Sequence, residues 1–226
     1  MCNLGCMTIS IIVALIMLVP LLFAKMITGA FVVLGFTSGQ AFLLLLLCLT
    51  GGLMNIPVKK WPGTNFSRQN GYFYFPGFER FLVPSGKILA VNLGGALIPG
   101  LVSLWEIWRI HTEFTISHPS SAFAFWTVFS VNTYVCYITA RPVEGKGIVI
   151  PAFIPPFVVA VLSLILAPAI APVIAFPAGV LGVLTGADIM HMKDIRNLDA
   201  PMISIGGAGT FDGIFLCGTL AVFLTG

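Results

Sequence analysis

The stretch from residue 148 to residue 187 contains no charged side chain. A helix needs about 20 apolar residues to cross a bilayer, so this stretch is long enough for two. The motif A-P-A-I-A-P at 167–172 divides it. Proline there interrupts a helix because it lacks an amide hydrogen. The sequence therefore predicts two membrane helices, the fifth and the sixth, joined by a hinge.

The whole chain is too apolar for a soluble protein of its size. Of its 226 residues, 58% are hydrophobic and 8% are charged, whereas a soluble domain has roughly 25% charged residues. The run A-F-L-L-L-L-L-C-L at 41–49 does not alternate with polar residues, as the strands of a membrane barrel would. We expect an all-α, polytopic integral membrane helix bundle that forms a single transmembrane domain over residues 1–226.

About seven transmembrane helices are expected. Their ranges are 3–24, 27–56, 88–108, 121–140, two within 148–187, and 210–226, with a loop at 109–120. The last is short unless 202–209 enters the membrane as a re-entrant piece, which the sequence leaves open. The connection 57–87 is rich in basic and aromatic residues, a composition that suits the lipid headgroup layer. The bilayer is therefore the expected partner, and a nucleic acid is not.

The distribution of cations predicts which side each loop occupies. With seven helices, the second, fourth and sixth loops lie on the side of the N-terminus and contain nine of the eleven Lys and Arg residues. Lys25 and Arg109 remain for the other side. A single crossing by 148–187 would make the split seven to four. Because cytoplasmic loops carry an excess of cations, we expect a multi-pass protein of the cell membrane with a cytoplasmic N-terminus. Loops 57–87 and 188–212 are then cytoplasmic.

Two aspartates at the ends of apolar runs are the candidate catalytic residues. Asp188 ends the sixth predicted helix and Asp212 begins the seventh, so both lie at the ends of the loop 188–212. Two carboxylates that share a proton can activate water and protonate a leaving group. The plainer interpretation is structural: Asp188 marks the membrane interface or pairs with Arg141, and Asp212 interacts favourably with the helix dipole.

Five supporting residues are expected, two of which, Asn92 and Arg141, lie at a depth similar to that of the aspartates. Asn92 lies early in the third predicted helix and Arg141 follows the fourth. Gly207 and Gly209 would let the backbone approach a substrate closely, while Thr210 is suited to cap the last helix.

No metal or other cofactor is expected. Asp188 and His191 share a helix face, but His111 and His118 are predicted on the opposite side of the membrane. The glycine-rich segment G-G-A-G-T-F-D-G lacks the lysine of a phosphate-binding loop. The five cysteines form no C-x-x-C pair and are interpreted as small apolar side chains.

Four motifs carry a resemblance to a known family. N-L-G-G-A-L-I-P, A-R-P-V-E-G-K-G-I-V-I-P-A-F-I-P-P, G-V-L-T-G-A-D-I-M-H-M-K-D-I and I-S-I-G-G-A-G-T-F-D-G-I-F-L resemble the prokaryotic membrane proteins of the domain of unknown function 1614. The resemblance implies a multi-span membrane protein and no particular activity. A looser similarity links Asp188 and Asp212 to the presenilin type of intramembrane aspartyl protease. Here Thr210 and Phe211 separate Gly209 from the second aspartate, unlike the G-x-G-D motif of that class.

Three functions follow from these observations as hypotheses. The first is a membrane-embedded diaspartyl hydrolase that uses Asp188 and Asp212 on a membrane-protein or peptide substrate. The alternative is a small proton- or cation-coupled transporter or channel, in which the same carboxylates bind the ion. The third is a non-catalytic membrane scaffold.

Overall fold

Helices form most of the described chain. The structure, a computed structural model, describes residues 2–62, 86–143, 147–197, 202–207 and 213–226. Among these residues, seven helices have 12 residues or more: α1 (Cys2–Val33), α2 (Ser38–Gly51), α3 (Ile98–Arg109), α5 (Ser121–Thr139), α6 (Ile154–Leu166), α7 (Ala171–Val183) and α9 (Gly213–Thr225). The expectation of a mainly helical protein is confirmed.

Short helical pieces extend or connect these helices. They are η1 (Leu93–Leu97), η2 (Ile110–Phe114), α4 (Thr115–Ser117), η3 (Pro168–Ile170), η4 (Leu184–Ile189) and α8 (Met192–Asn197). The predicted hinge at 167–172 is confirmed, because η3 separates α6 from α7. The predicted loop at 109–120 is mostly wrong, because η2 and α4 continue the helical path beyond α3.

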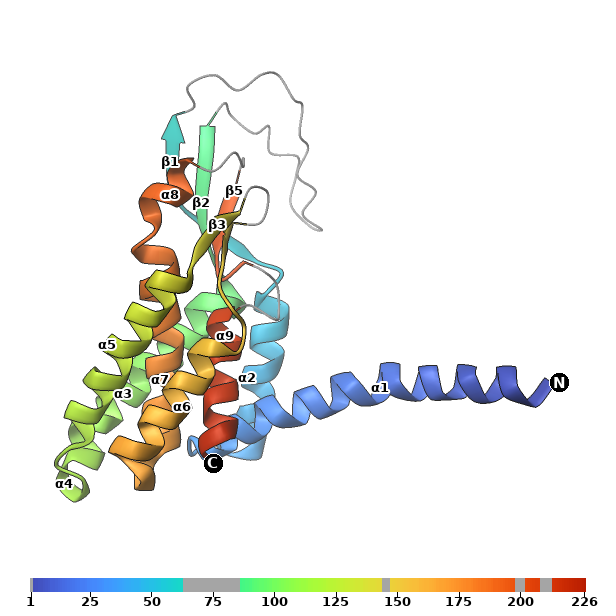
Figure 1. The fold of residues 1–226 in the computed structure, drawn as a ribbon, viewed down its shortest axis with the longest axis horizontal. Coiled ribbons are helices and arrows are strands. Elements are labelled where there is room, and N and C mark those ends of the chain that lie inside the picture. Colours follow the sequence, from blue (N-terminus) through green and yellow to red (C-terminus); the bar gives the residue numbers. More distant parts are fainter. Residues whose placement is uncertain (1, 63–85, 144–146, 198–201, 208–212) are drawn as a thin grey trace.

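The arrangement of the helices defines two ends of the molecule. Helices α2, α3, α5, α6, α7 and α9 run side by side (Figure 1). All the strands and α8 lie at one end, here called the strand end, and α4 and the C-terminus lie at the other. Helix α1 leaves the bundle at a steep angle. The chain leaves α2, α5 and α7 at the strand end, so the described parts of the three loops expected to share the cytoplasmic side lie there.

The boundary predicted between the first two helices is wrong. Helix α1 continues through Lys25 to Val33, and the chain turns at Gly35, whose φ is 98°. Helix α2 then begins with a capping box. The Gln40 amide donates to the Thr37 hydroxyl, and the Thr37 amide donates to the Gln40 side chain at 2.9 Å. This exchange satisfies two donors that a helix start would leave free, and it divides the run predicted as one helix over 27–56.

Two small sheets correct the all-α expectation. Strands β1 (Asn55–Pro62), β2 (Gly86–Asn92) and β5 (Met202–Ile205) form one sheet in the order β1-β2-β5, antiparallel and then parallel. Strands β3 (Arg141–Val143) and β4 (Gly147–Val149) form a hairpin. The helix predicted from residue 88 therefore starts as a strand, and the predicted loop 57–87 begins and ends in strands, its residues 63–85 lying outside the described chain. Residues 202–205 are a strand rather than a re-entrant helix.

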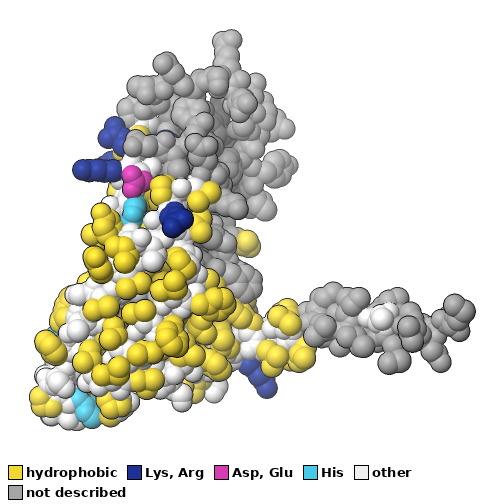
Figure 2. All heavy atoms as spheres, viewed as in Figure 1, with side chains coloured by type: hydrophobic (Ala, Val, Ile, Leu, Met, Phe, Trp, Pro, Cys, Tyr) yellow, Lys and Arg dark blue, Asp and Glu magenta, His cyan; other side chains and the backbone are white. Residues whose placement is uncertain are grey.

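The surface of the bundle is apolar as well as its core. Core side chains such as Phe31, Phe125 and Phe176 are completely buried. Large apolar side chains are nevertheless exposed on five of the bundle helices, with Phe42, Leu104, Phe123, Ile165 and Phe223 each at 56–70%. Figure 2 shows hydrophobic side chains covering the visible face of the bundle. Soluble monomers rarely expose an apolar surface of this extent.

Length and apolarity identify two stretches of described helix that are able to cross a membrane. They are Ser121–Thr139, which is α5, and Pro168–Ile189, which is η3, α7 and η4 together. Four shorter apolar helices of 10–17 residues accompany them: Met17–Val33, Ser38–Gly51, Ile154–Leu166 and Gly213–Thr225.

Candidate functional site

Asp188 lies half-buried in η4, the π-helical continuation of α7 at the strand end. The η4 segment packs against α5 near the buried Cys136. The chain approaches α5 here because Gly186 has no side chain. A Cβ at that position would overlap the carbonyl oxygen of Thr133 and lie 2.8 Å from the Cβ of Cys136. Asp188 is therefore held at a helix interface by close backbone packing.

The fully buried Asn132 lies one helical turn before Cys136 in α5 and stabilises the same interface. Its side-chain amide donates to the carbonyl oxygens of Ala178, at 3.0 Å, and Gly179, at 3.4 Å. Its oxygen accepts from the Cys136 thiol at 3.7 Å. An interior amide bonded in this way ties α5 to α7, since an unpaired polar group would be costly there.

His191 interacts with the helix and with an aromatic ring. Its Nδ1 lies 3.1 Å from the Gly186 carbonyl oxygen, which identifies this nitrogen as the protonated donor. Its ring packs against Tyr137 with centroids 5.0 Å apart. The described residues contain no group of three or more His, Cys, Asp or Glu side chains that could hold a metal ion.

Asn92 has a structural role that differs from its predicted place early in a helix. It ends β2, caps η1 and is completely buried. Its side-chain nitrogen donates to the Gly52 carbonyl at 2.8 Å and to Asn55 Oδ1 at 3.1 Å, and its oxygen accepts from the Gly95 amide at 2.8 Å. Ser204 of β5 donates to the same Asn55 oxygen. These hydrogen bonds attach the three-stranded sheet to the strand end of the bundle.

The other predicted site residues are only partly described. Gly207 is exposed, and a Cβ there would overlap the Ser204 side chain, so the close approach at this glycine is to the protein's own strand. Arg141 is exposed in β3 at the strand end. Gly209, Thr210 and Asp212 lie outside the described residues, and so does any contact between Asp212 and Asp188.

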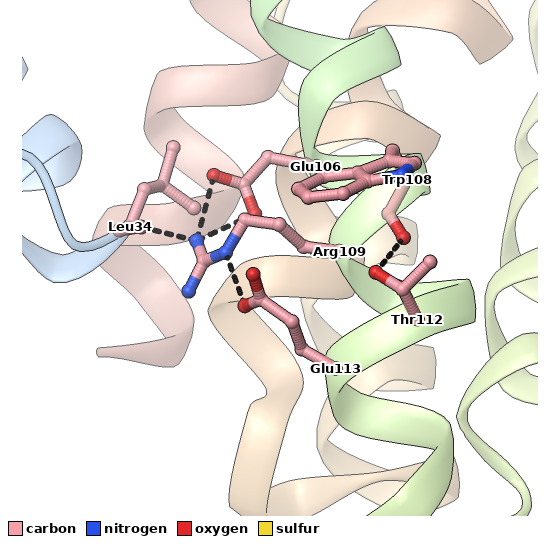
Figure 3. A network of polar contacts seen from close by, with 6 residues as sticks. All are labelled: Leu34, Glu106, Trp108, Arg109, Thr112 and Glu113. Atoms are coloured by element: carbon pink, nitrogen blue, oxygen red, sulfur yellow. Dashed lines mark hydrogen bonds and ion pairs between the residues drawn. The ribbon is translucent and has the colours of Figure 1, made fainter.

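An ion-pair network that is not among the residues predicted from the sequence lies at the opposite end from the sheets. Arg109 Nη1 donates to the Glu106 carboxylate, the ion pair measuring 3.1 Å, and to the Leu34 carbonyl at the end of α1 at 2.7 Å (Figure 3). Its Nε donates to Glu113 at 3.1 Å. Glu106 is completely buried, whereas 52% of the Glu113 side chain is exposed. The E-x-x-R-x-x-x-E spacing was the available signal, because residues three and four apart meet on a helix.

Comparison with known proteins agrees with the sequence resemblance. Residues 49–224 match the family described as "Protein of unknown function (DUF1614)". The chain belongs to the DUF1614 family. Neither the curated proteins nor the solved structures contain a match. The DUF1614 match covers every element from the end of α2 to α9, and therefore both the Asp188 region and the Glu106–Arg109 pair.

Proposed function

We propose that this DUF1614 protein is a multi-pass protein of the cell membrane in which each of the seven long helices crosses the bilayer, α1 by turning from its steep angle in Figure 1 towards the direction of the bundle. The large apolar side chains exposed on the bundle helices are the observation that carries this proposal. Ser121–Thr139 and Pro168–Ile189 are each long and apolar enough to cross alone. The shorter helices α6 and α9, with 13 residues each, would span about 20 Å, so the residues that flank them would complete each crossing.

A reporter fused to the C-terminus tests this topology. With the strand end in the cytoplasm, an odd number of crossings puts Gly226 outside. We expect alkaline phosphatase fused there to be active and a fluorescent protein fused there to stay dark. Fusions after residue 146, between β3 and β4, are expected to show the reverse pattern. A cytoplasmic signal at Gly226 would contradict seven crossings.

We further propose that the chemistry of this protein is hydrolysis of a membrane-embedded peptide by Asp188 and Asp212. In such a pair one carboxylate takes a proton from water, which attacks the peptide carbonyl, and the protonated partner donates to the carbonyl oxygen. The tetrahedral intermediate then collapses. The amide nitrogen leaves with a proton, and the products are a carboxylic acid and an amine. Transport remains the alternative for the same carboxylates.

The packing of α7 against α9 supports this pairing. These two helices form the most extensive contact between described elements, and a Cβ on Gly179 would lie 3.2 Å from the Cα of Gly218. They run in opposite directions, so the end of α7 and the start of α9 both face the strand end. At about 1.5 Å per residue, Asp188 lies about 13 Å beyond this crossing and Gly213, which follows Asp212, about 8 Å beyond it.

Substitution of Asp188 tests the hydrolase directly. In liposomes that contain a fluorescent transmembrane peptide, we expect Asp188→Asn and Asp212→Asn each to reduce cleavage at least about 100-fold, the usual contribution of an acid–base group. Asp194→Asn, at an exposed aspartate of α8, is the matched control and should cleave normally. Equal melting temperatures show that the variants fold.

Three results would overturn the hydrolase. One is cleavage that survives both substitutions. Another is wild-type protein that neither cleaves the peptide nor binds a hydroxyl-bearing peptide isostere of the tetrahedral intermediate. The last is proton flux across liposomes that both variants lose while no peptide is cut, because this result assigns the carboxylates to transport.

A further inference from the structure

Cations from three elements meet at the strand end. The pairing of β1 with β2 puts Lys60 opposite Ile88 and Trp61 opposite Lys87. Lys87 is buried, and its Nζ donates to the Arg196 carbonyl of α8 at 2.7 Å. One buried lysine therefore brings the basic residues of β1 next to those of α8.

The charge at this meeting point is strongly positive. Lys59 and Lys60 on β1, and Lys193 and Arg196 on α8, are all exposed. The described residues of β1, β2 and α8 contain one acidic side chain, Asp194. We call the four exposed cations the basic cluster. Figure 2 shows Lys and Arg side chains at this end of the molecule, above the apolar surface of the bundle.

The cluster has the features of a headgroup-level surface. Lys59 Nζ lies 5.8 Å from the centre of the Trp61 ring, and Trp61 is half-buried. Exposed Ile56 and Val58 on the same strand continue the apolar surface up to the cations. Tryptophan beside lysine, above an apolar surface, is typical of the membrane–water boundary. Buried Ile195 anchors α8 and fixes its two cations in place.

We propose that the basic cluster binds the phosphate headgroup of an anionic phospholipid in the leaflet at the strand end. This proposal rests on the membrane insertion proposed above and is independent of the hydrolase. A phospholipid is favoured over a soluble anion because the cations adjoin exposed apolar side chains that would contact its acyl chains. Because each cation is attracted to an anionic surface, the four together favour anionic over zwitterionic lipid.

Lipid competition tests the proposal on the full-length protein. The protein is reconstituted into nanodiscs of phosphatidylcholine with a minor fraction of phosphatidylglycerol, and the lipids that remain bound after extraction are counted by native mass spectrometry. We expect wild type to retain phosphatidylglycerol at least about 10-fold over its share, with the preference falling as salt is raised. The fourfold variant Lys59→Gln, Lys60→Gln, Lys193→Gln, Arg196→Gln should lose the preference.

Two matched controls separate charge from side-chain shape and from position. The charge-conserving variant Lys59→Arg, Lys60→Arg, Lys193→Arg, Arg196→Lys should keep the preference, as should Lys25→Gln on α1. Wild type without a preference, or a fourfold Gln variant that keeps it, would overturn the proposal. The proposal would also be overturned if inorganic phosphate or an oligonucleotide displaced the bound phosphatidylglycerol as effectively as anionic lipid does, because the site would then be one for a soluble anion.

An alkaline wash of native membranes distinguishes this failure from a failure of insertion. Protein that stays in the washed membrane but shows no lipid preference contradicts the basic cluster alone. Protein that the wash releases contradicts the membrane topology itself and removes the basis of the lipid proposal.

Discussion

Replacement of Gly94 by alanine is expected to lower the free energy of unfolding by about 3 kcal/mol or more, the upper end of the cost of overpacking. Gly94 lies in η1, directly against the end of α2. A Cβ there would overlap the carbonyl oxygen of Cys48 and the amide of Gly52. Both are backbone atoms of a packed helix, so neither is able to rotate away.

The damage would extend to the hydrogen bonds around this contact. The Leu93 amide donates to the Met54 carbonyl at 2.9 Å, and Asn92 donates to the Gly52 carbonyl. Pushing η1 away from α2 would stretch both bonds, and each buried group left without a partner costs about 1–3 kcal/mol. The change is measured as the unfolding free energy of the purified protein in detergent.

Gly100→Ala is the matched control, because it makes the same chemical change in α3, a few residues further along the chain. Nothing lies within 4 Å of a Cβ at Gly100. Alanine is favoured over glycine within a helix by about 1 kcal/mol, so this variant should be slightly more stable than wild type. Destabilisation of equal size at both positions would show that the close contact at Gly94 is not what limits the substitution.

Most of the helices could be predicted from the apolar runs of the sequence, but the boundary between α1 and α2 could not. The apolar runs and the A-P-A-I-A-P hinge correspond to observed helices. Lys25 suggests the end of a helix when only the sequence is considered. Helix α1 accommodates it, because the apolar stem of a lysine can lie along an apolar surface while its charged group reaches water. The signal that was missed, T-S-G-Q at 37–40, is local and has a physical mechanism, the capping box.

The sheets could not be predicted from local sequence. K-I-L-A-V before Asn92 and M-I-S-I before Gly206 are short apolar runs, which periodicity does not distinguish from helix. They become strands because β2 pairs in parallel with β5, more than 100 residues later in the chain. Such pairing depends on the arrangement of the intervening helices, which no local pattern contains.

The candidate site was predicted in part for the same reason. Asp188 could be identified because a carboxylate at the end of an apolar run is unusual. Asn92 was identified by the same reasoning, but the structure shows its side chain bonded to Gly52, Asn55 and Gly95. A polar residue in an apolar run is chemically conspicuous whether it serves a substrate or its own backbone, so sequence alone does not separate the two roles.

Removal of the buried carboxylate in Glu106→Ala is expected to lower the free energy of unfolding by about 3–5 kcal/mol, the usual cost of breaking a buried ion pair. Glu106 is completely buried and the Arg109 side chain is only 15% exposed. Without Glu106, the guanidinium would keep the Leu34 carbonyl and the half-exposed Glu113 as partners. The measurement is unfolding in detergent, as for Gly94.

The pair also attaches α1 to the bundle, which gives a second readout. Arg109 donates to the Leu34 carbonyl and so caps the last turn of α1. Once Glu106 no longer orients the Arg109 side chain, α1 should pack less tightly against the bundle. Ala30 of α1 is 2% exposed, and a cysteine introduced there should react with a maleimide faster in the Glu106→Ala background than in wild type. Glu106→Gln keeps one acceptor oxygen and the shape of the side chain, so its labelling rate should lie between those of wild type and Glu106→Ala.

Glu113→Ala supplies the contrast that decides the interpretation. Its ion pair with Arg109 is exposed to solvent, so its removal should cost no more than about 1 kcal/mol and leave labelling at position 30 unchanged. Equal costs for the two glutamates would mean that burial does not set the strength of this network. The expected inequality would instead show that the charge of Arg109 is neutralised inside the protein. In the proposed topology, Arg109 would then add little net charge to the side of the membrane opposite the basic cluster, and the charge asymmetry between the two sides would be larger than a count of cations suggests.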